Sequence, residues 1–342
     1  MNPDKNHYVI TNTAGDIDRQ QWESFVAEHP QANFFQTPDY VDLHSGVKGY
    51  TPYVVAAFDS DKQMVGVLVA IRNSVYSGMG SYITSRAIVE GGPLIDARHP
   101  QVADILLKSY CDIMKHRIIY TQFRNQFDMS PFQGAFQHVN AIFEEHLNIL
   151  IDLQKPEETL WQEVHPKRRN KIRQAQKQQV EVRELVNTEE REQSWQILRE
   201  VYQREKLPLA KKALFEHAFE LLIPRGRLKI YGAFYQQLLI GTRYLFTYKD
   251  CIFDWYAGSH EQFYTVRPND LLPWEIFLRS KAEGFTQFNF GGAGKPNVPY
   301  GVRDYKLRFG GTVVNYGRYE IIHNYTIFTL MRTAFRLWQY LH

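Results

Sequence analysis

The feature that most constrains the fold is a pattern of hydrophobic segments that occurs twice along the chain. Each copy begins with two runs of β-branched and aromatic residues joined by a polar turn, at 53–69 and at 229–244. Such paired runs are typical of an antiparallel hairpin. Each copy continues with a third strand, a segment whose apolar residues have helical spacing, and a strand that contains Thr-Gln-Phe, at 121–123 and at 286–288. The repeat predicts two homologous domains of similar size.

The length agrees with this division. A chain of 342 residues has room for two domains of about 150 residues each. We expect an N-terminal domain over 1–153 and a C-terminal domain over 154–342. The order hairpin, strand, helix, strand matches the core of the GNAT acyltransferase fold, in which two neighbouring strands separate and hold an acylated donor between them. The expected fold class is therefore α/β with mixed sheets, in two tandem GNAT-like domains.

Charge is distributed unevenly between the two halves. Residues 1–153 contain 11 Lys and Arg against 17 Asp and Glu, whereas 154–342 contain 29 against 20. We therefore expect an anionic partner for the second half. A predicted helix over 165–177 has six basic residues and no acidic one: Lys167, Arg168, Arg169, Lys171, Arg173 and Lys177. Arg169 and Arg173 lie on one face of this helix and could bind one diphosphate, although a solvated surface helix is the alternative.

Three segments resemble the Fem family of bacterial aminoacyltransferases, which build peptidoglycan cross-bridges. The basic segment His-Pro-Lys-Arg-Arg-Asn-Lys-Ile-Arg-Gln-Ala at 165–175 resembles the helix that opens the second domain of that family. Residues 301–311, Gly-Val-Arg-Asp-Tyr-Lys-Leu-Arg-Phe-Gly-Gly, resemble its G-x-x-x-[FY]-K-x-x-F-G signature. Asn-Phe-Phe-Gln-Thr-Pro at 33–38 resembles the Phe-Gln-Ser/Thr entry to its first domain. The chain lacks the long antiparallel helical arm that several of these enzymes use for transfer RNA.

The resemblance implies an enzyme that moves an aminoacyl or acyl group from an activated donor to an amine of a phosphate-bearing cell-envelope precursor. Lys306 of the signature would stabilise charge at the transferred carbonyl or the leaving group, unless it only packs its stem against the fold. Asp254 and Asp304 are candidates for taking the proton of the attacking amine, with structural ion pairs as the alternative. The residues expected to bind substrate are Lys167, Arg168, Arg169, Arg173, Arg303 and Tyr305.

The donor is expected to be an aminoacyl-tRNA or an acyl-CoA used as cosubstrate, with no permanently bound cofactor and no metal. Neither repeat contains the Q/R-x-x-G-x-G/A loop that cradles the pyrophosphate of coenzyme A, which weakens the acyl-CoA reading. Two alternatives stay open. One is an acyl-CoA-dependent N-acyltransferase acting on a nucleotide-linked sugar of surface polysaccharide. The other is a non-catalytic protein whose basic helix binds nucleic acid or a protein partner.

The ends of the chain bear on location. No apolar run approaches the roughly 18 residues of a membrane span, and residues 1–7 lack a hydrophobic signal core. We expect a cytoplasmic protein, with peripheral membrane contact as a second option. The segment 324–342 predicts an amphipathic helix with the apolar stripe Ile327, Phe328, Met331, Ala334, Phe335, Trp338 and Leu341. We expect this helix to close the core, and a helix on a membrane surface is the alternative.

Overall fold

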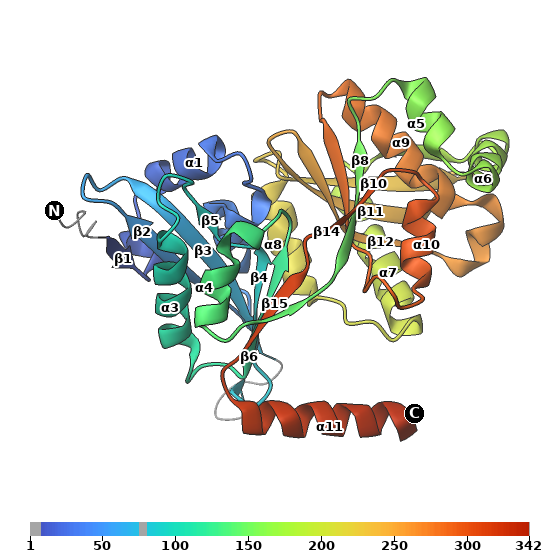
Figure 1. Ribbon diagram of the computed structural model, residues 1–342. Coiled ribbons are helices and arrows are strands. Elements are labelled where there is room, and N and C mark those ends of the chain that lie inside the picture. The colour runs from blue at the N-terminus through green and yellow to red at the C-terminus, as the bar shows by residue number, and fades with distance from the viewer. Residues whose placement is uncertain (1–7, 75–80, 342) are drawn as a thin grey trace. The chain divides into compact units, whose positions relative to one another are not determined.

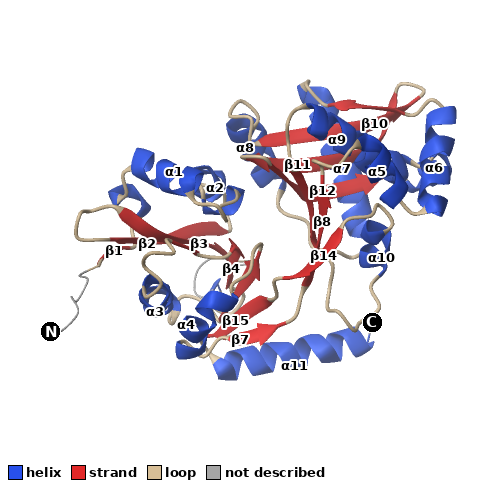
Figure 2. Cartoon of the chain, turned by 45° about the horizontal axis from the view of Figure 1, so that its top comes forward, coloured by secondary structure: helices blue, strands red, loops and turns tan. Residues whose placement is uncertain are grey.

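The computed structural model describes residues 8–74 and 81–341, and it divides the chain into two compact units (Figure 1). The first unit is formed by residues 1–145 and 316–342, and the second by residues 146–315. Each unit consists of a mixed β-sheet with helices packed against it (Figure 2).

The sheet of the first unit has the order β1-β2-β3-β4-β6-β15-β7, with β5 beside β3. Its central hairpin is the first of the two predicted from sequence, and β4 and β6 run parallel. The strands are β1 (Val9–Thr11), β2 (Tyr50–Phe58), β3 (Met64–Asn73), β4 (Arg86–Gly91), β5 (Leu94–Ile95), β6 (Tyr120–Asn125), β7 (Ile142–Glu144) and β15 (Arg318–Ile322). The helices are α1 (Arg19–Glu28), α2 (Pro38–His44), α3 (Val102–Met114), α4 (Gln133–His138) and α11 (Tyr325–Leu341), with 3₁₀ turns at Ala14–Asp16, Phe34–Gln36 and Ser130–Phe132.

The Phe-Gln-Thr entry of the first unit is a packed structural feature. Asn33 and Gln36 form a reciprocal capping box around the 3₁₀ turn Phe34–Gln36. The fully buried Gln36 amide also donates to the carbonyl of Gly92, at 3.0 Å. Gly91 has a φ of +85°, and a Cβ there would lie 2.5 Å from Gln36 Nε2. The motif therefore joins the start of α2 to the end of β4.

The sheet of the second unit has the order β14-β8-β13-β12-β11-β10-β9 and contains the second predicted hairpin, β10 with β11. Its strands are β8 (Leu147–Asp152), β9 (Glu181–Glu184), β10 (Leu228–Tyr235), β11 (Leu238–Tyr248), β12 (Cys251–Ser259), β13 (Gln287–Gly292) and β14 (Thr312–Asn315). Its helices are α5 (Glu157–Glu163), α6 (Pro166–Lys177), α7 (Thr188–Arg204), α8 (Lys212–Leu222), α9 (Pro268–Ala282) and α10 (Gly301–Leu307), with a 3₁₀ turn at Glu261–Val266.

The two parallel strand pairs differ in a way that locates the candidate site. In the first unit, β4 and β6 stay paired over their whole length, from Arg86 opposite Tyr120 to Gly91 opposite Asn125. In the second unit, the pairing of β12 with β13 ends at Phe253 opposite Asn289. A β-bulge follows directly in β12, where Tyr244 and Leu245 of β11 face Tyr256 and Asp254. Among the described strands, only the second unit thus has the separated pair expected of a donor site.

The division of the chain differs from the expected domains 1–153 and 154–342. The first division falls at 145/146, and the chain returns to the first unit after residue 315. The physical reason is β15, which pairs with β6 on one side and with β7 on the other. Figure 1 shows β15, in red, beside strands from the first half of the chain.

The predicted helix over 324–342 is present as α11, but its described side chains do not close the core. Leu330 is 66% exposed and Met331 is 38% exposed. The first turn packs against the sheet, where the rings of Phe328 and Tyr120 have centroids 5.3 Å apart. The side chains from Ala334 onward lie outside the described ones. In the described part of the chain, α11 and every other helix is too short or too polar to cross a membrane.

Candidate functional site

Lys306 lies at the end of α10 and faces the last part of β13. Its Nζ donates to the carbonyl of Phe290 at 2.6 Å and to that of Gly292 at 2.8 Å. These two hydrogen bonds use two of the three N–H donors of the ammonium group. Desolvation lowers the pKa of Lys306 to about 8, against the opposing charge of Asp254. The lysine is therefore a fixed cation at the point where β12 and β13 separate.

The residues around Lys306 fix its position. Phe309 packs on Phe290 of β13 and on Phe277 of α9, with ring centroids 5.8 and 6.0 Å apart. Tyr305 packs on Phe309 at 5.4 Å, and its hydroxyl donates to the carbonyl of Asn269 at 2.6 Å. Two elements of the core therefore hold the short helix that carries Lys306.

Asp254 and Arg243 form a largely buried ion pair beside this lysine. The Arg243 guanidinium donates to Asp254 Oδ2 at 2.7 Å, and the two side chains are 4% and 10% exposed. Burial raises the pKa of Asp254, while the charges of Arg243 and Lys306 oppose that change. Within the described residues, Asp254 Oδ1 is buried and has no hydrogen-bond partner. A free acceptor oxygen of this kind is costly to bury and marks a site that a ligand N–H can satisfy.

Arg243 is a site residue that the sequence analysis missed. It lies in β11, whose other residues are uncharged, and all of β11 after Leu238 is buried. The sequence held one signal, a single cation in an otherwise uncharged strand. A cation there is expected to be buried, and a buried charge is nearly always paired with an opposite charge. Tyr202 and Tyr256 pack against each other near the same ion pair. Their rings are 5.4 Å apart, and burial together with the charge of Asp254 raises the pKa of Tyr202.

Arg168 is a buried residue of α6. Its guanidinium pairs with Asp270 of α9, and the two side chains are 5% and 9% exposed. It also donates to the carbonyl of Tyr305 at 3.1 Å and lies 4.5 Å from the centroids of the Tyr305 and Phe309 rings. Arg168 therefore joins α6, α9 and α10 and positions the segment that carries Lys306.

The other predicted binding residues separate into two groups. Arg303 donates to the carbonyls of Lys295 and Val298, at 2.5 and 2.6 Å, so it holds the loop that precedes α10. Lys167 and Arg173 are exposed on α6, and Arg169 is half-buried. These three predicted binding residues are accessible to an anion, whereas Arg168 is not. Asp304 is exposed on α10 and is not among the partners of Lys306.

The start of α9 lies where a GNAT domain would bind a pyrophosphate. In this chain a proline and a carboxylate stand at that position. Pro268 is the first helical residue and has no N–H to offer, and Arg267 before it has a φ of +63°. Asp270 places a carboxylate in the first turn and pairs it with Arg168. A second anion at this helix start would meet like charge in place of converging amide groups.

Comparisons with known proteins agree with this geometry. Residues 166–307 match the family model described as an acetyltransferase (GNAT) domain. No curated protein matches the chain by sequence. The fold is similar to the crystal structure of FemX, with a TM-score of 0.73, 14% identity, and coverage of 92% of this chain and 98% of that one.

Two further structures show the same tandem fold. L-PGS from Bacillus licheniformis has a TM-score of 0.58 and 14% identity, with 92% of this chain and 96% of that chain covered. A tandem GNAT protein from the clavulanic acid biosynthesis pathway has a TM-score of 0.58 and 15% identity, with 93% and 99% covered. The predicted fold class is confirmed. The chain is an acyltransferase built from two GNAT-like domains in tandem.

Proposed function

We propose that this chain transfers an aminoacyl or acyl group from an activated donor to an amine of a phosphate-bearing cell-envelope precursor. The observation that carries the proposal is the pair of Lys306 and Asp254 at the separation of β12 and β13. A desolvated ammonium and an unpartnered carboxylate oxygen there couple electrostatically, as their mutual effects on pKa indicate. The fold shared with FemX and L-PGS supports the choice of aminoacyl transfer.

The chemistry follows from these two groups. The acceptor amine attacks the carbonyl carbon of the donor ester, and the proton of that amine passes to Asp254 Oδ1. The remaining N–H of Lys306 donates to the oxyanion that forms at the carbonyl oxygen. The ester C–O bond then breaks, the leaving oxygen takes the proton from Asp254, and the product is an amide.

The donor is proposed to be an aminoacyl-tRNA. Pro268 and the carboxylate of Asp270 at the start of α9 disfavour binding of the pyrophosphate of coenzyme A there. An aminoacyl ester places no diphosphate at that position. The acyl-CoA-dependent N-acyltransferase acting on a nucleotide-linked sugar is the second candidate, and the match to an acetyltransferase domain favours it. The exposed Lys167 and Arg173 and the half-buried Arg169 would contact phosphate groups in either case.

Transfer assays with labelled donors test the proposal. The protein is incubated with nucleotide-linked and lipid-linked peptidoglycan precursors, and with either aminoacyl-tRNA or acetyl-CoA carrying a labelled acyl group. We expect label to move from the tRNA to a precursor amine, with the new amide located by mass spectrometry. Transfer from acetyl-CoA to an amino sugar would establish the second candidate. Absence of transfer from both donors with a folded protein would contradict the proposal.

The pH dependence of turnover gives a test of Asp254. Above about pH 8 the rate should fall, because Lys306 loses the proton that makes it a cation. Asp254 favours the ammonium form, so Asp254→Asn should lower the pKa of Lys306 further and move this alkaline limb by about one pH unit toward acid. A kcat profile of both proteins measures the shift. An unmoved limb would show that Asp254 does not act on Lys306.

Peripheral membrane contact is proposed for α11, whose exposed Leu330 and Met331 lie on a helix that has two arginines and no acidic residue. We expect the protein to co-sediment with vesicles that contain anionic lipid. Leu330→Glu should weaken this binding by about tenfold or more, because it removes inserted apolar area and adds repulsion. Thr329→Glu at the neighbouring exposed position is the control, because it adds the same charge without removing a large apolar side chain. Equal vesicle binding by Leu330→Glu and the parent would exclude α11 as the contact.

A further inference from the structure

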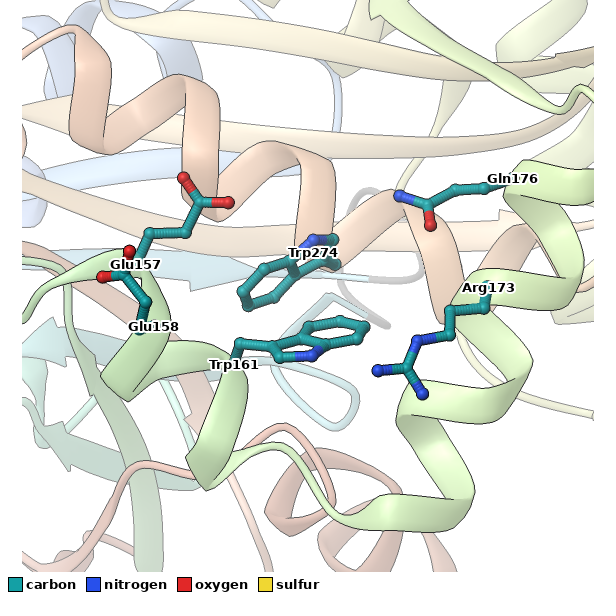
Figure 3. Close-up of a pocket in the computed structure, with 6 residues that line it drawn as sticks. All are labelled: Glu157, Glu158, Trp161, Arg173, Gln176 and Trp274. Carbon is teal, nitrogen blue, oxygen red and sulfur yellow. The ribbon is translucent and has the colours of Figure 1, made fainter.

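A second site candidate lies on the surface of the second unit, where α5, α6 and α9 meet. A cavity of about 300 Å³ is lined by Glu157, Glu158, Trp161, Arg173, Gln176 and Trp274 (Figure 3). This volume is at the lower end for small-molecule sites. Neither Lys306 nor Asp254 lines it, so the cavity is separate from the residues assigned to the chemical step.

Unpaired charges mark the two sides of this cavity. Arg173 is exposed, and within the described residues it has no carboxylate partner and no hydrogen-bond acceptor. Glu157 and Glu158 likewise have no cationic partner among the residues described. Figure 3 shows the two carboxylates on one side of the tryptophans and the guanidinium on the other. The cavity can therefore satisfy a ligand that has an anion at one end and N–H donors at the other.

The floor between these charges is aromatic. Trp161 and Trp274 have ring centroids 4.8 Å apart and planes tilted by 56°. Trp274 is 4% exposed and fixed in the core, whereas Trp161 is half-buried. Arg173 lies 5.2 Å from the centroid of Trp161, and this cation–π contact holds the guanidinium at the rim of the cavity. An indole in this position offers a surface on which a flat ring can stack.

We propose that this cavity binds one nucleotide, with its base on Trp161, its phosphate on Arg173 and an exocyclic amino group of the base on Glu157 or Glu158. Carboxylates accept from the amino groups of cytosine and adenine, and uracil has no such group. Arg169 lies one turn from Arg173 on the same helix, so a further phosphate meets positive charge. The proposal adds a subsite to the proposed function, and its test measures binding alone, so it can fail while the transfer chemistry stands.

Calorimetric titration with 5′-AMP, 5′-CMP and 5′-UMP tests the base and the phosphate separately. We expect AMP and CMP to bind several-fold more tightly than UMP, and the combined change Glu157→Ala and Glu158→Ala to remove this preference. Arg173→Gln should weaken AMP binding by about tenfold or more. Lys177→Gln makes the same charge change on an exposed residue of α6 outside the cavity, and should weaken it less than about twofold.

Trp161→Leu removes the stacking surface and should weaken AMP binding by about tenfold. Trp161→Phe keeps a ring and should lose less, which separates stacking from any general effect on the fold. Equal losses from Arg173→Gln and Lys177→Gln would overturn the proposal, because they would indicate a diffuse electrostatic attraction. The absence of binding by all three nucleotides at millimolar concentration would overturn it as well.

Two further ligands then identify the source of the nucleotide. An oligoribonucleotide ending in CCA that binds more tightly than AMP, and loses affinity in Arg173→Gln, would assign the cavity to the end of a transfer RNA. A nucleoside diphosphate sugar that binds more tightly than the oligonucleotide would assign it to a nucleotide-linked acceptor. Both results support a nucleotide in the cavity.

Discussion

Replacing Lys306 by methionine is expected to lower kcat by about a hundredfold or more while changing the acceptor KM little. The charge that Lys306 neutralises develops only as the carbonyl is attacked, so its loss raises the transition state more than the ground state. Methionine retains most of the apolar stem, which keeps the packing of α10. Steady-state kinetics with the donor and acceptor identified in the transfer assays measure the effect.

Lys306→Arg should rescue poorly. The compact ammonium donates to two carbonyls of β13, at 2.6 and 2.8 Å, and a planar guanidinium cannot reproduce that geometry and still direct a donor at the oxyanion. The unfolding midpoints of both variants are compared with the parent first, because a structural lysine would show its loss as instability. A folded Lys306→Met enzyme that turns over within threefold of the parent would assign Lys306 to packing.

Much of the fold could be predicted from sequence because it depends on local periodicity. The hairpins β2–β3 and β10–β11 follow from paired runs of β-branched and aromatic residues around a polar turn. The helices α3 and α9 follow from helical apolar spacing, and the structure places them where that spacing occurs. The return of β15 to the first unit could not be predicted in this way. A strand of five residues carries no signal for which sheet it joins, and its pairing with β6 spans almost 200 residues of sequence.

The candidate site was predictable only in part, for the same reason. Lys306 was found because it lies in a local motif. Arg168 and Arg173 look equivalent in a run of six cations, but one is buried in an ion pair and the other lies at the rim of a cavity. That difference depends on Asp270, which is 102 residues from Arg168 in sequence. We therefore propose that Arg168 positions α10, in place of the predicted role in substrate binding.

A test of this positioning role is the stability of Arg168→Met. Removing the guanidinium leaves Asp270 as a largely buried carboxylate with no counter-charge, and breaking a buried pair in this way costs about 3–5 kcal/mol of unfolding free energy. It also removes the contacts of the guanidinium with the rings of Tyr305 and Phe309. Denaturant titration followed by circular dichroism should show a large drop in the unfolding midpoint of the second unit.

The double change Arg168→Met with Asp270→Leu decides between lost packing and an uncompensated charge. Because both charges are removed, most of the stability should return, as is often found when apolar side chains replace a buried ion pair. Arg169→Met is the matched control: it removes a half-buried cation from the next position of α6, and it should change the free energy of unfolding by no more than about 0.5 kcal/mol. A substrate-binding Arg168 would behave differently, since Arg168→Met would then unfold with the parent and lose only affinity. Such a result would return Arg168 to the substrate site and leave Asp270 without its assigned partner.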